Sequence, residues 1–185
     1  MHQPTLLVAL LLLAGCSAIG GGEETLACDA GASVSTSPAA PSHREDVAFD
    51  VTGPEALATV WLLDGEPIEE PRHRFDAPGT HALEARLFTG DGCVAVGSLS
   101  LDVRNDAPQA HFSYAVSMDR LHLDARRSSD PNADELSYVW EVGGVGAGSG
   151  VEHLADVPPQ GTVIKLVVSD PWGGEDRYQE QFAWG

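Results

Sequence analysis

Basic residues are scarce in this chain of 185 residues, which has ten Lys and Arg side chains against 28 Asp and Glu. The formal net charge is −18 at pH 7, and Lys165 is the single lysine. A surface with this charge repels nucleic acids and anionic lipid headgroups, and one lysine argues against a phosphate-binding surface. Solubility in a crowded compartment explains such a surface, and adaptation to salt or use of Ca²⁺ is the alternative.

The chain also lacks an apolar run of the about 20 residues that a membrane-spanning helix needs. The run from Leu6 to Ala14 is much shorter and predicts the apolar core of a signal peptide. It ends in Leu13-Ala14-Gly15-Cys16, where small residues precede a cysteine whose thiol can be acylated. These four residues resemble the lipobox of bacterial lipoproteins.

On that resemblance, residues 1–15 are a signal peptide and Cys16 carries the lipid anchor in a bacterial membrane. Several acyl chains are needed, because one chain alone holds only marginally. Met1 to Thr5 contain no Lys or Arg, unlike the usual signal peptide, so a plain secretory signal with an unrelated cysteine is the alternative. In Gram-negative lipoproteins an Asp after the cysteine retains the protein in the inner membrane. Ser17 therefore implies the outer membrane.

Cysteine is rare as well, with three in the chain. If Cys16 carries lipid, Cys28 and Cys93 remain, and in an oxidising compartment such a pair usually forms a disulfide. The bridge would close a loop of about 65 residues and stabilise the fold by roughly 4 kcal/mol. Two free thiols are the alternative. We expect no zinc site, because zinc usually takes four close ligands.

A convincing helical period is missing after the short flexible tether, Ser17–Glu24. Alternating apolar residues instead predict strands separated by turns. The expected strands of the first half are Val47–Val51, Thr59–Leu63, His81–Leu87 and Leu99–Val103. Those of the second half are Leu121–Leu123, Leu136–Trp140, Ile164–Val168 and Tyr178–Phe182. The glycine-rich run Gly143–Gly150 has no Lys and no following helix, which favours a flexible hairpin loop over a phosphate cradle.

The two halves repeat one arrangement, in which Trp61 corresponds to Trp140. Short strands at this spacing, in halves of under 100 residues, predict immunoglobulin-like β-sandwiches, each with a buried tryptophan as its large packing element. We therefore predict an all-β chain that follows its signal peptide with a lipidated cysteine and tether (16–27) and two tandem sandwiches (28–104 and 105–185).

Three stretches of the second half together form a distinctive sequence pattern: Asn105–Pro108, Leu121–Asp134 with Leu136–Trp140, and Leu166–Gly173. They resemble a polycystic-kidney-disease-type (PKD) domain and cover most of residues 105–185, and the first half resembles it more weakly. The family implies a β-sandwich used for adhesion, spacing or contacts with carbohydrate or protein, and no catalysis. Many members have a Gly-Asp-Gly turn after the tryptophan. The turn after Trp140 has no Asp, so any Ca²⁺ ligand there is lost.

Calcium is the best metal candidate because it takes six to eight oxygen ligands. Asp130, Asn132 and Asp134 alternate in a loop and could direct oxygens at one ion. Alternatively, these side chains accept hydrogen bonds from backbone amides in an Asx-rich turn. We favour the turn and assign no metal site.

Catalytic motifs are lacking: the chain has no Gly-x-Ser-x-Gly, His-Glu-x-x-His or Walker-type loop. His111 and His122 lie on expected strands and could face each other, while His73 and His81 flank Phe75. No third ligand accompanies either pair, so we interpret these histidines as surface or edge residues.

The combined expectation is a non-enzymatic envelope lipoprotein without cofactors that acts as an adhesion, interaction or spacer module. Its partner would be an envelope protein, or a glycan that stacks on an exposed aromatic such as Trp172 or Trp184. One alternative is a small secreted hydrolase or its accessory subunit, which a buried carboxylate pair at the Arg104–Pro108 junction would favour. The other is a calcium-rigidified stalk.

Overall fold

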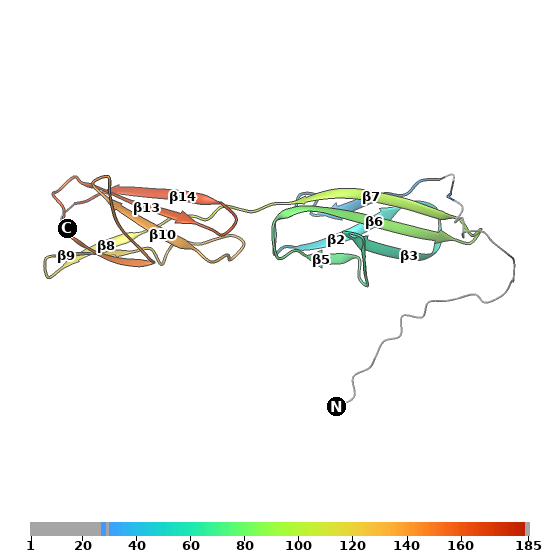
Figure 1. Cartoon of the computed structure of the whole chain (residues 1–185), viewed down its shortest axis with the longest axis horizontal. Helices are drawn as coiled ribbons and strands as arrows, with labels where there is room; N and C mark the ends of the chain where they lie inside the picture. The colour runs from blue at the N-terminus through green and yellow to red at the C-terminus, as the bar shows by residue number, and fades with distance from the viewer. Residues whose placement is uncertain (1–26, 29, 184–185) are drawn as a thin grey trace, which may run out of the picture.

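The computed structural model describes residues 27–28 and 30–183. Within them, all regular structure is strand, arranged in two three-stranded and two four-stranded sheets. These sheets form two lobes that lie end to end and are joined by one connection (Figure 1). Among the described residues, no helix is long and apolar enough to span a membrane.

The first lobe is a sandwich of sheets β1-β2-β5 and β4-β3-β6-β7, with antiparallel neighbours throughout. Its strands are β1 (Ser33–Ser37), β2 (Asp46–Thr52), β3 (Ala56–Leu63), β4 (Glu66–Ile68), β5 (Arg72–Arg74), β6 (Gly79–Thr89) and β7 (Val94–Val103). On β6, the alternating residues Leu83, Ala85 and Leu87 are buried and face the other sheet's Val47 and Phe49 in one core. This burial confirms the alternation that the sequence shows.

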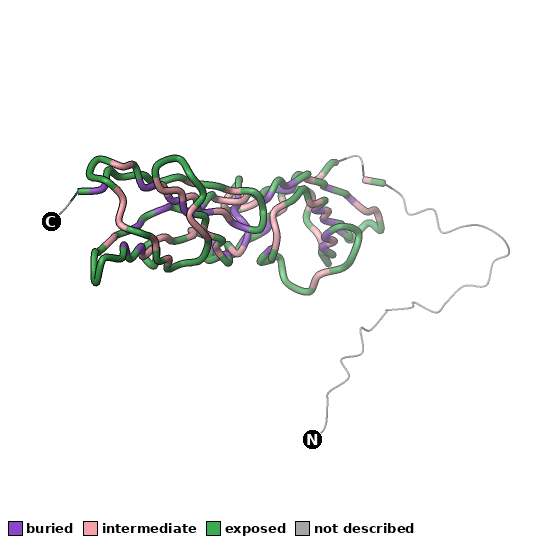
Figure 2. The backbone as a smooth tube through the Cα atoms, turned by 60° about the vertical axis from the view of Figure 1, so that its left-hand side comes forward, coloured by how far each residue is buried: buried purple, intermediate pink, exposed green. Residues whose placement is uncertain are grey.

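The second lobe is a sandwich of sheets β12-β9-β8 and β11-β10-β13-β14. Its strands are β8 (Ser113–Ser117), β9 (Arg120–Asp124), β10 (Ser137–Val142), β11 (Val145–Ser149), β12 (Glu152–Asp156), β13 (Val163–Ser169) and β14 (Glu175–Gln181). Buried segments line the interior of both lobes (Figure 2). The core of this lobe combines Leu121 and Leu123 of one sheet with Trp140, Ile164 and Leu166 of the other.

The two tryptophans hold equivalent positions, since β3 and β10 are each second in a four-stranded sheet. Trp61 is 8% exposed and Trp140 is fully buried. The indole Nε1 of Trp140 donates to the Gly150 carbonyl at 2.9 Å, so burial leaves no unpaired donor. The predicted fold class, all-β with tandem immunoglobulin-like sandwiches, is confirmed.

The expected hairpin at Gly143–Gly150 is present, but the expectation that the whole run is a loop is wrong. Only Gly143 and Gly144 form the turn, with positive φ angles of 63° and 79°, and the following residues form β11, which pairs with β10. Glycine serves a different purpose within this strand, because a Cβ on Gly148 would overlap the ring of His153. The glycine run therefore lets a side chain pack closely against the backbone.

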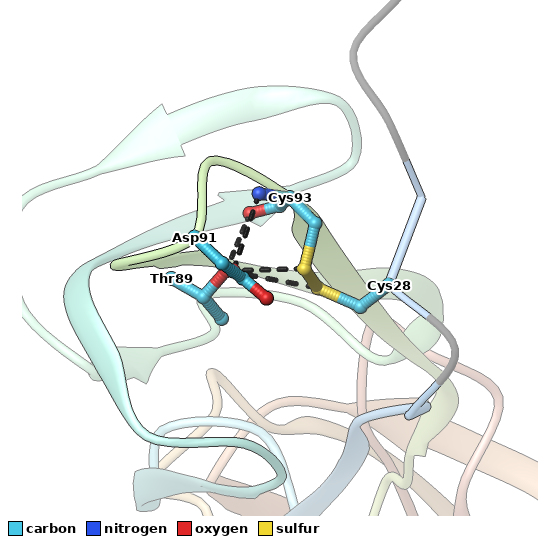
Figure 3. Close-up of a disulfide and its surroundings, with 4 residues drawn as sticks. All are labelled: Cys28, Thr89, Asp91 and Cys93. Atoms are coloured by element: carbon cyan, nitrogen blue, oxygen red, sulfur yellow. Dashed lines mark hydrogen bonds between the residues drawn. A yellow bond between two sulfur atoms is a disulfide. The ribbon is translucent and has the colours of Figure 1, made fainter.

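The structure contains the expected disulfide between Cys28 and Cys93, whose Cα atoms are 5.1 Å apart. It ties the start of the described chain to the turn between β6 and β7, where Thr89 Oγ1 also donates to the Cys93 carbonyl at 3.0 Å (Figure 3). Cys28 N donates to the Val94 carbonyl at 3.2 Å. The chain thus enters the first sandwich at the end opposite Val103.

Candidate functional site

The connection between the sandwiches is hydrogen-bonded to both of them. Arg104 N donates to the Pro41 carbonyl and His43 N donates to the Arg104 carbonyl, both at 2.9 Å. On the other side, Asn105 Nδ2 donates to Asp170 Oδ2 at 2.7 Å. The linker is therefore held between the two domains by contacts on each side.

A set of four residues, which we name the junction clasp, links the domains directly: His43 and Arg44 from the first, Asn132 and Asp134 from the second. His43 Nε2 lies 2.8 Å from Asp134 Oδ2, and the two side chains are 0% and 1% exposed. Neither atom has a hydrogen-bond partner among the described residues, so the two side chains are joined by this close approach of the imidazole to the carboxylate. Asn132 Nδ2 donates to the His43 carbonyl at 2.9 Å.

Arg44 completes the clasp from the solvent side. Its Nη2 lies 3.2 Å from Asp134 Oδ1, and its Nη1 donates to the carbonyls of Asn132 at 3.0 Å and Ala133 at 2.6 Å. Each oxygen of Asp134 thus lies within ion-pair distance of a basic side chain of the first domain. Removing one partner of such a buried pair generally costs about 3–5 kcal/mol, because the remaining charge stays buried without compensation. The clasp resists any separation of the domains.

The loop that carries Asp134 is built by Asx-type hydrogen bonds. Asp130 Oδ1 accepts from Asn132 N at 2.7 Å and from Asp134 N at 3.2 Å. Asn132 Oδ1 accepts from Asp106 N at 2.9 Å. The three side chains have separate partners, as the Asx-turn interpretation expects. Within the described ranges, no group of three or more His, Cys, Asp or Glu is placed to hold a metal ion.

A second buried carboxylate, Asp170, lies at the junction in the turn between β13 and β14. Oδ1 accepts from Trp172 N and Gly174 N, each at 2.8 Å, and Oδ2 accepts from Asn105. Burial by itself would raise the pKa of Asp170, but the hydrogen bonds from Asn105 and the turn's backbone amides outweigh it and lower the pKa. Asp170 is consequently an ionised acceptor that organises the turn.

Trp172 sits beside the clasp. Its ring meets the His43 ring edge-on, with centroids 6.0 Å apart, and the residue remains 45% exposed. The other aromatic proposed for glycan stacking, Trp184, lies outside the described residues, as do the lipidation site Cys16 and the signal peptide. Those predictions stay predictions.

The remaining histidines are spread over both domains. His73 and His81 flank Phe75 with ring centroids 4.8 and 4.4 Å from it. His81 Nδ1 also lies 2.8 Å from Asp64 Oδ2, and this hydrogen bond, with one from Ala82 N, lowers the pKa of Asp64. These contacts have structural roles within the first sandwich.

His111 lies outside the strands, contrary to the expectation, whereas His122 lies on β9 as expected. His111 packs against Tyr178 at 5.5 Å, while His122 lies between Ala115 and Leu154 across the sheet β12-β9-β8. His122 lines a recess of about 720 Å³ on that sheet, together with Ser113 and Ala115. The two rings therefore have different neighbours.

Sequence reasoning did not identify His43 and Arg44. They lie in a short polar stretch before β2 that shows no motif and no alternation. Their importance arises only from contact with a loop about 90 residues later in the chain, so no local signal could have revealed it.

No family's sequence model matches this chain, and no curated protein matches it. Among solved structures, it is similar to the PKD1 domain of Vibrio anguillarum Epp, at 24% identity over 43% of this chain and 94% of that one, with a TM-score of 0.38. It is also similar to the fibronectin(III)-like modules of Clostridium thermocellum CbhA, at 15% identity over 80% and 90% of the two chains, with a TM-score of 0.35. Three N-terminal domains of the Highly Immunogenic Outer Capsid protein of bacteriophage RB49 share 13% identity over 82% of this chain and 57% of that one, with a TM-score of 0.39. At such identities and TM-scores the likenesses concern the fold alone.

Proposed function

We propose that the protein is a non-enzymatic envelope lipoprotein whose two sandwiches form a rigid spacer and interaction module, anchored through Cys16 in the outer membrane. The observation that carries the proposal is the buried junction clasp, which holds the domains end to end. A flexible tether of domains would have no need for a buried His–Asp pair across its joint.

The path of the chain supports a spacer. The described chain starts at the disulfide end of the first sandwich, and β7 runs from that end to the junction. In the second sandwich, Asp170 places the β13–β14 turn at the junction, and β14 then runs away from it. The two chain ends of the folded region therefore lie at opposite ends of the molecule (Figure 1). An anchor at one end would hold the second domain away from the membrane.

The state of the junction carboxylates supports a role without catalysis. A hydrolase needs a carboxylate or histidine that is free to exchange a proton with substrate. At this junction, the oxygens of Asp134 are bound to His43 and Arg44, and those of Asp170 to Asn105 and backbone amides. The buried carboxylates that would have favoured a hydrolase are thus committed to structure.

Rigidity can be measured by ¹⁵N relaxation on the protein from Ser17 onward, which keeps both sandwiches whole. We expect both domains to report one anisotropic tumbling time in the wild type. The double variant His43→Ala/Arg44→Ala should give two shorter, independent times, because it removes the first domain's side of the clasp. His122→Ala, on the recess far from the clasp, is the matched control. Independent tumbling in the wild type would rule out a rigid spacer.

Anchoring is tested separately by incorporation of labelled palmitate in a bacterial host. We expect label in the wild type and in Cys28→Ala, and none in Cys16→Ala. Fractionation should place the wild type in the outer membrane and Ser17→Asp in the inner membrane. Label retained by Cys16→Ala would disprove the anchor assignment.

An envelope protein or glycan as partner belongs to this proposal, and Trp172 is the half-exposed tryptophan on which a sugar could stack. Cosedimentation with insoluble cell-wall glycan should fall several-fold in Trp172→Ala. Met118→Ala, which removes a side chain that is 95% exposed elsewhere, is the control. Equal binding by the two variants would exclude Trp172 as the stacking residue.

A further inference from the structure

Most of the basic residues of this acidic chain are paired with a carboxylate. Seven of the ten have a carboxylate oxygen within 4.0 Å: Arg44, Arg72, Arg86, Arg120, Arg126, Lys165 and Arg177. Across the part of the chain that the structure describes, the three without such a partner are Arg74, Arg104 and Arg127. With 28 acidic residues available, an unpaired arginine is the exception here.

Two of these three exceptions line the same hollow. A groove of about 540 Å³ at the junction is lined by three of the clasp residues, His43, Arg44 and Asn132. Arg74 and Arg104 also line it. Glu45 and Asp106 also line it, yet neither forms an ion pair with these arginines. Glu45 Oε2 instead accepts from Ser42 N at 3.1 Å. The groove therefore has cationic groups available in a molecule whose field is otherwise anionic.

The two arginines are placed by the fold. Arg104 Nη2 donates to the Ala40 carbonyl at 2.9 Å, which fixes its guanidinium and leaves its other N–H groups for a ligand. Arg74 lies on β5, where its backbone pairs with Asp46 of β2, and no side chain among the described residues holds its guanidinium. Arg74 and Arg104 line the same hollow, where a small anion could reach both guanidinium groups.

Arginine's planar fork fits a carboxylate with two parallel hydrogen bonds, and ligand sites occur preferentially at domain interfaces. We propose that the junction groove binds the carboxylate group of a small ligand through Arg74 and Arg104. The net charge of −18 repels multiply charged anions, phosphate included, more strongly than a single charge, so the ligand proposed here carries one carboxylate. The site requires the closed junction but neither the lipid anchor nor a macromolecular partner, so it can fail without affecting those proposals.

The test is a titration followed by ¹H–¹⁵N NMR at constant ionic strength, on the protein from Ser17 onward. Sodium glucuronate and N-acetylalanine represent the two sources of a lone carboxylate, an acidic sugar and a peptide terminus. Glucose and inorganic phosphate are the neutral and tetrahedral controls. We expect saturable shifts at Arg74, Arg104 and their neighbours with at least one carboxylate, and none of comparable size with glucose or phosphate. Whichever carboxylate binds more tightly identifies the source.

Arg74→Gln and Arg104→Gln should each weaken that binding about tenfold or more, as expected for a lost charge-assisted hydrogen bond. Arg127→Gln is the matched control, because it removes the same charge from the third unpaired arginine, which does not line the groove. Arg74→Gln should keep the wild-type unfolding midpoint, which separates lost binding from lost structure. Binding that falls equally in Arg127→Gln, or that is matched by phosphate or glucose, or that is absent for both carboxylates, overturns the proposal.

Discussion

Replacing both Cys28 and Cys93 by alanine should destabilise the first sandwich and leave the second unchanged. The two cysteines are 65 residues apart in sequence, so the bridge spans nearly the whole first domain. Closing a loop of about this length removes roughly 14 cal/mol/K of entropy from the unfolded chain, or about 4 kcal/mol at 25 °C. For a small domain that loses about 2 kcal/mol per molar guanidinium, the unfolding midpoint should fall by about 2 M.

Each domain has its own reporter for this experiment. Trp61 belongs to the core of the first sandwich and Trp140 to that of the second, so their indole N–H resonances follow the two transitions separately in guanidinium. The guanidinium midpoint followed at Trp61 should be lower in the variant than in the wild type, while the midpoint followed at Trp140 should be unchanged within error. A Trp61 shift corresponding to less than about 1 kcal/mol would refute the loop-entropy reasoning. Equal shifts at both tryptophans would show that the domains unfold as one unit.

Three further predictions concern the second domain. Trp140→Ala should lower the free energy of unfolding by about 3–5 kcal/mol, because the side chain is fully buried, and the denaturant midpoint should fall with it. A loss under 1 kcal/mol would contradict the central place of Trp140 in the core. Gly148→Ala should lower the free energy of unfolding by about 1–3 kcal/mol, because the added methyl group overlaps His153. Gly146→Ala is the control: an added Cβ there meets open space, so the free energy of unfolding should stay within about 0.5 kcal/mol of the wild type. Equal shifts of the melting temperature in the two variants would disprove the contact. Asp170 has a pKa that its hydrogen bonds keep low despite burial, so its contribution is present above the unfolded value of about 3.9 and is lost as pH falls through the lower folded value. Asp170→Asn should therefore flatten the decline in unfolding free energy below about pH 4, and a wild-type slope in denaturant titrations across that range would count against it.

Long strands with one buried face could be predicted from the sequence, because alternation directly reports which side chains leave water. The expected strand at His81–Leu87 lies inside β6, and that at Ile164–Val168 lies inside β13. Short strands such as β4 and β5 have three residues each, too few to show a period. They are strands only because a neighbouring strand supplies their hydrogen bonds.

Glycine content by itself does not predict the order of one segment, for a physical reason. The run Gly143–Gly150 suggested flexibility, yet β11 is ordered by its ladder with β10 and by the ring of His153. Glycine content indicates how much conformational freedom the unfolded chain has, whereas strand pairing and side-chain packing decide whether the segment is ordered in the folded protein.

The sequence by itself determined the two sandwich cores, the matching tryptophans and the partners of the disulfide, since each follows from alternation, repetition or the small number of cysteines. The tertiary structure alone decided how the sandwiches meet. His43 and Asp134 are 91 positions apart, and no sequence pattern in either loop predicts contact with the other loop. Their pairing exists because the linker's hydrogen bonds bring two loop ends together, and that same meeting creates the groove where two arginines remain without an acidic partner.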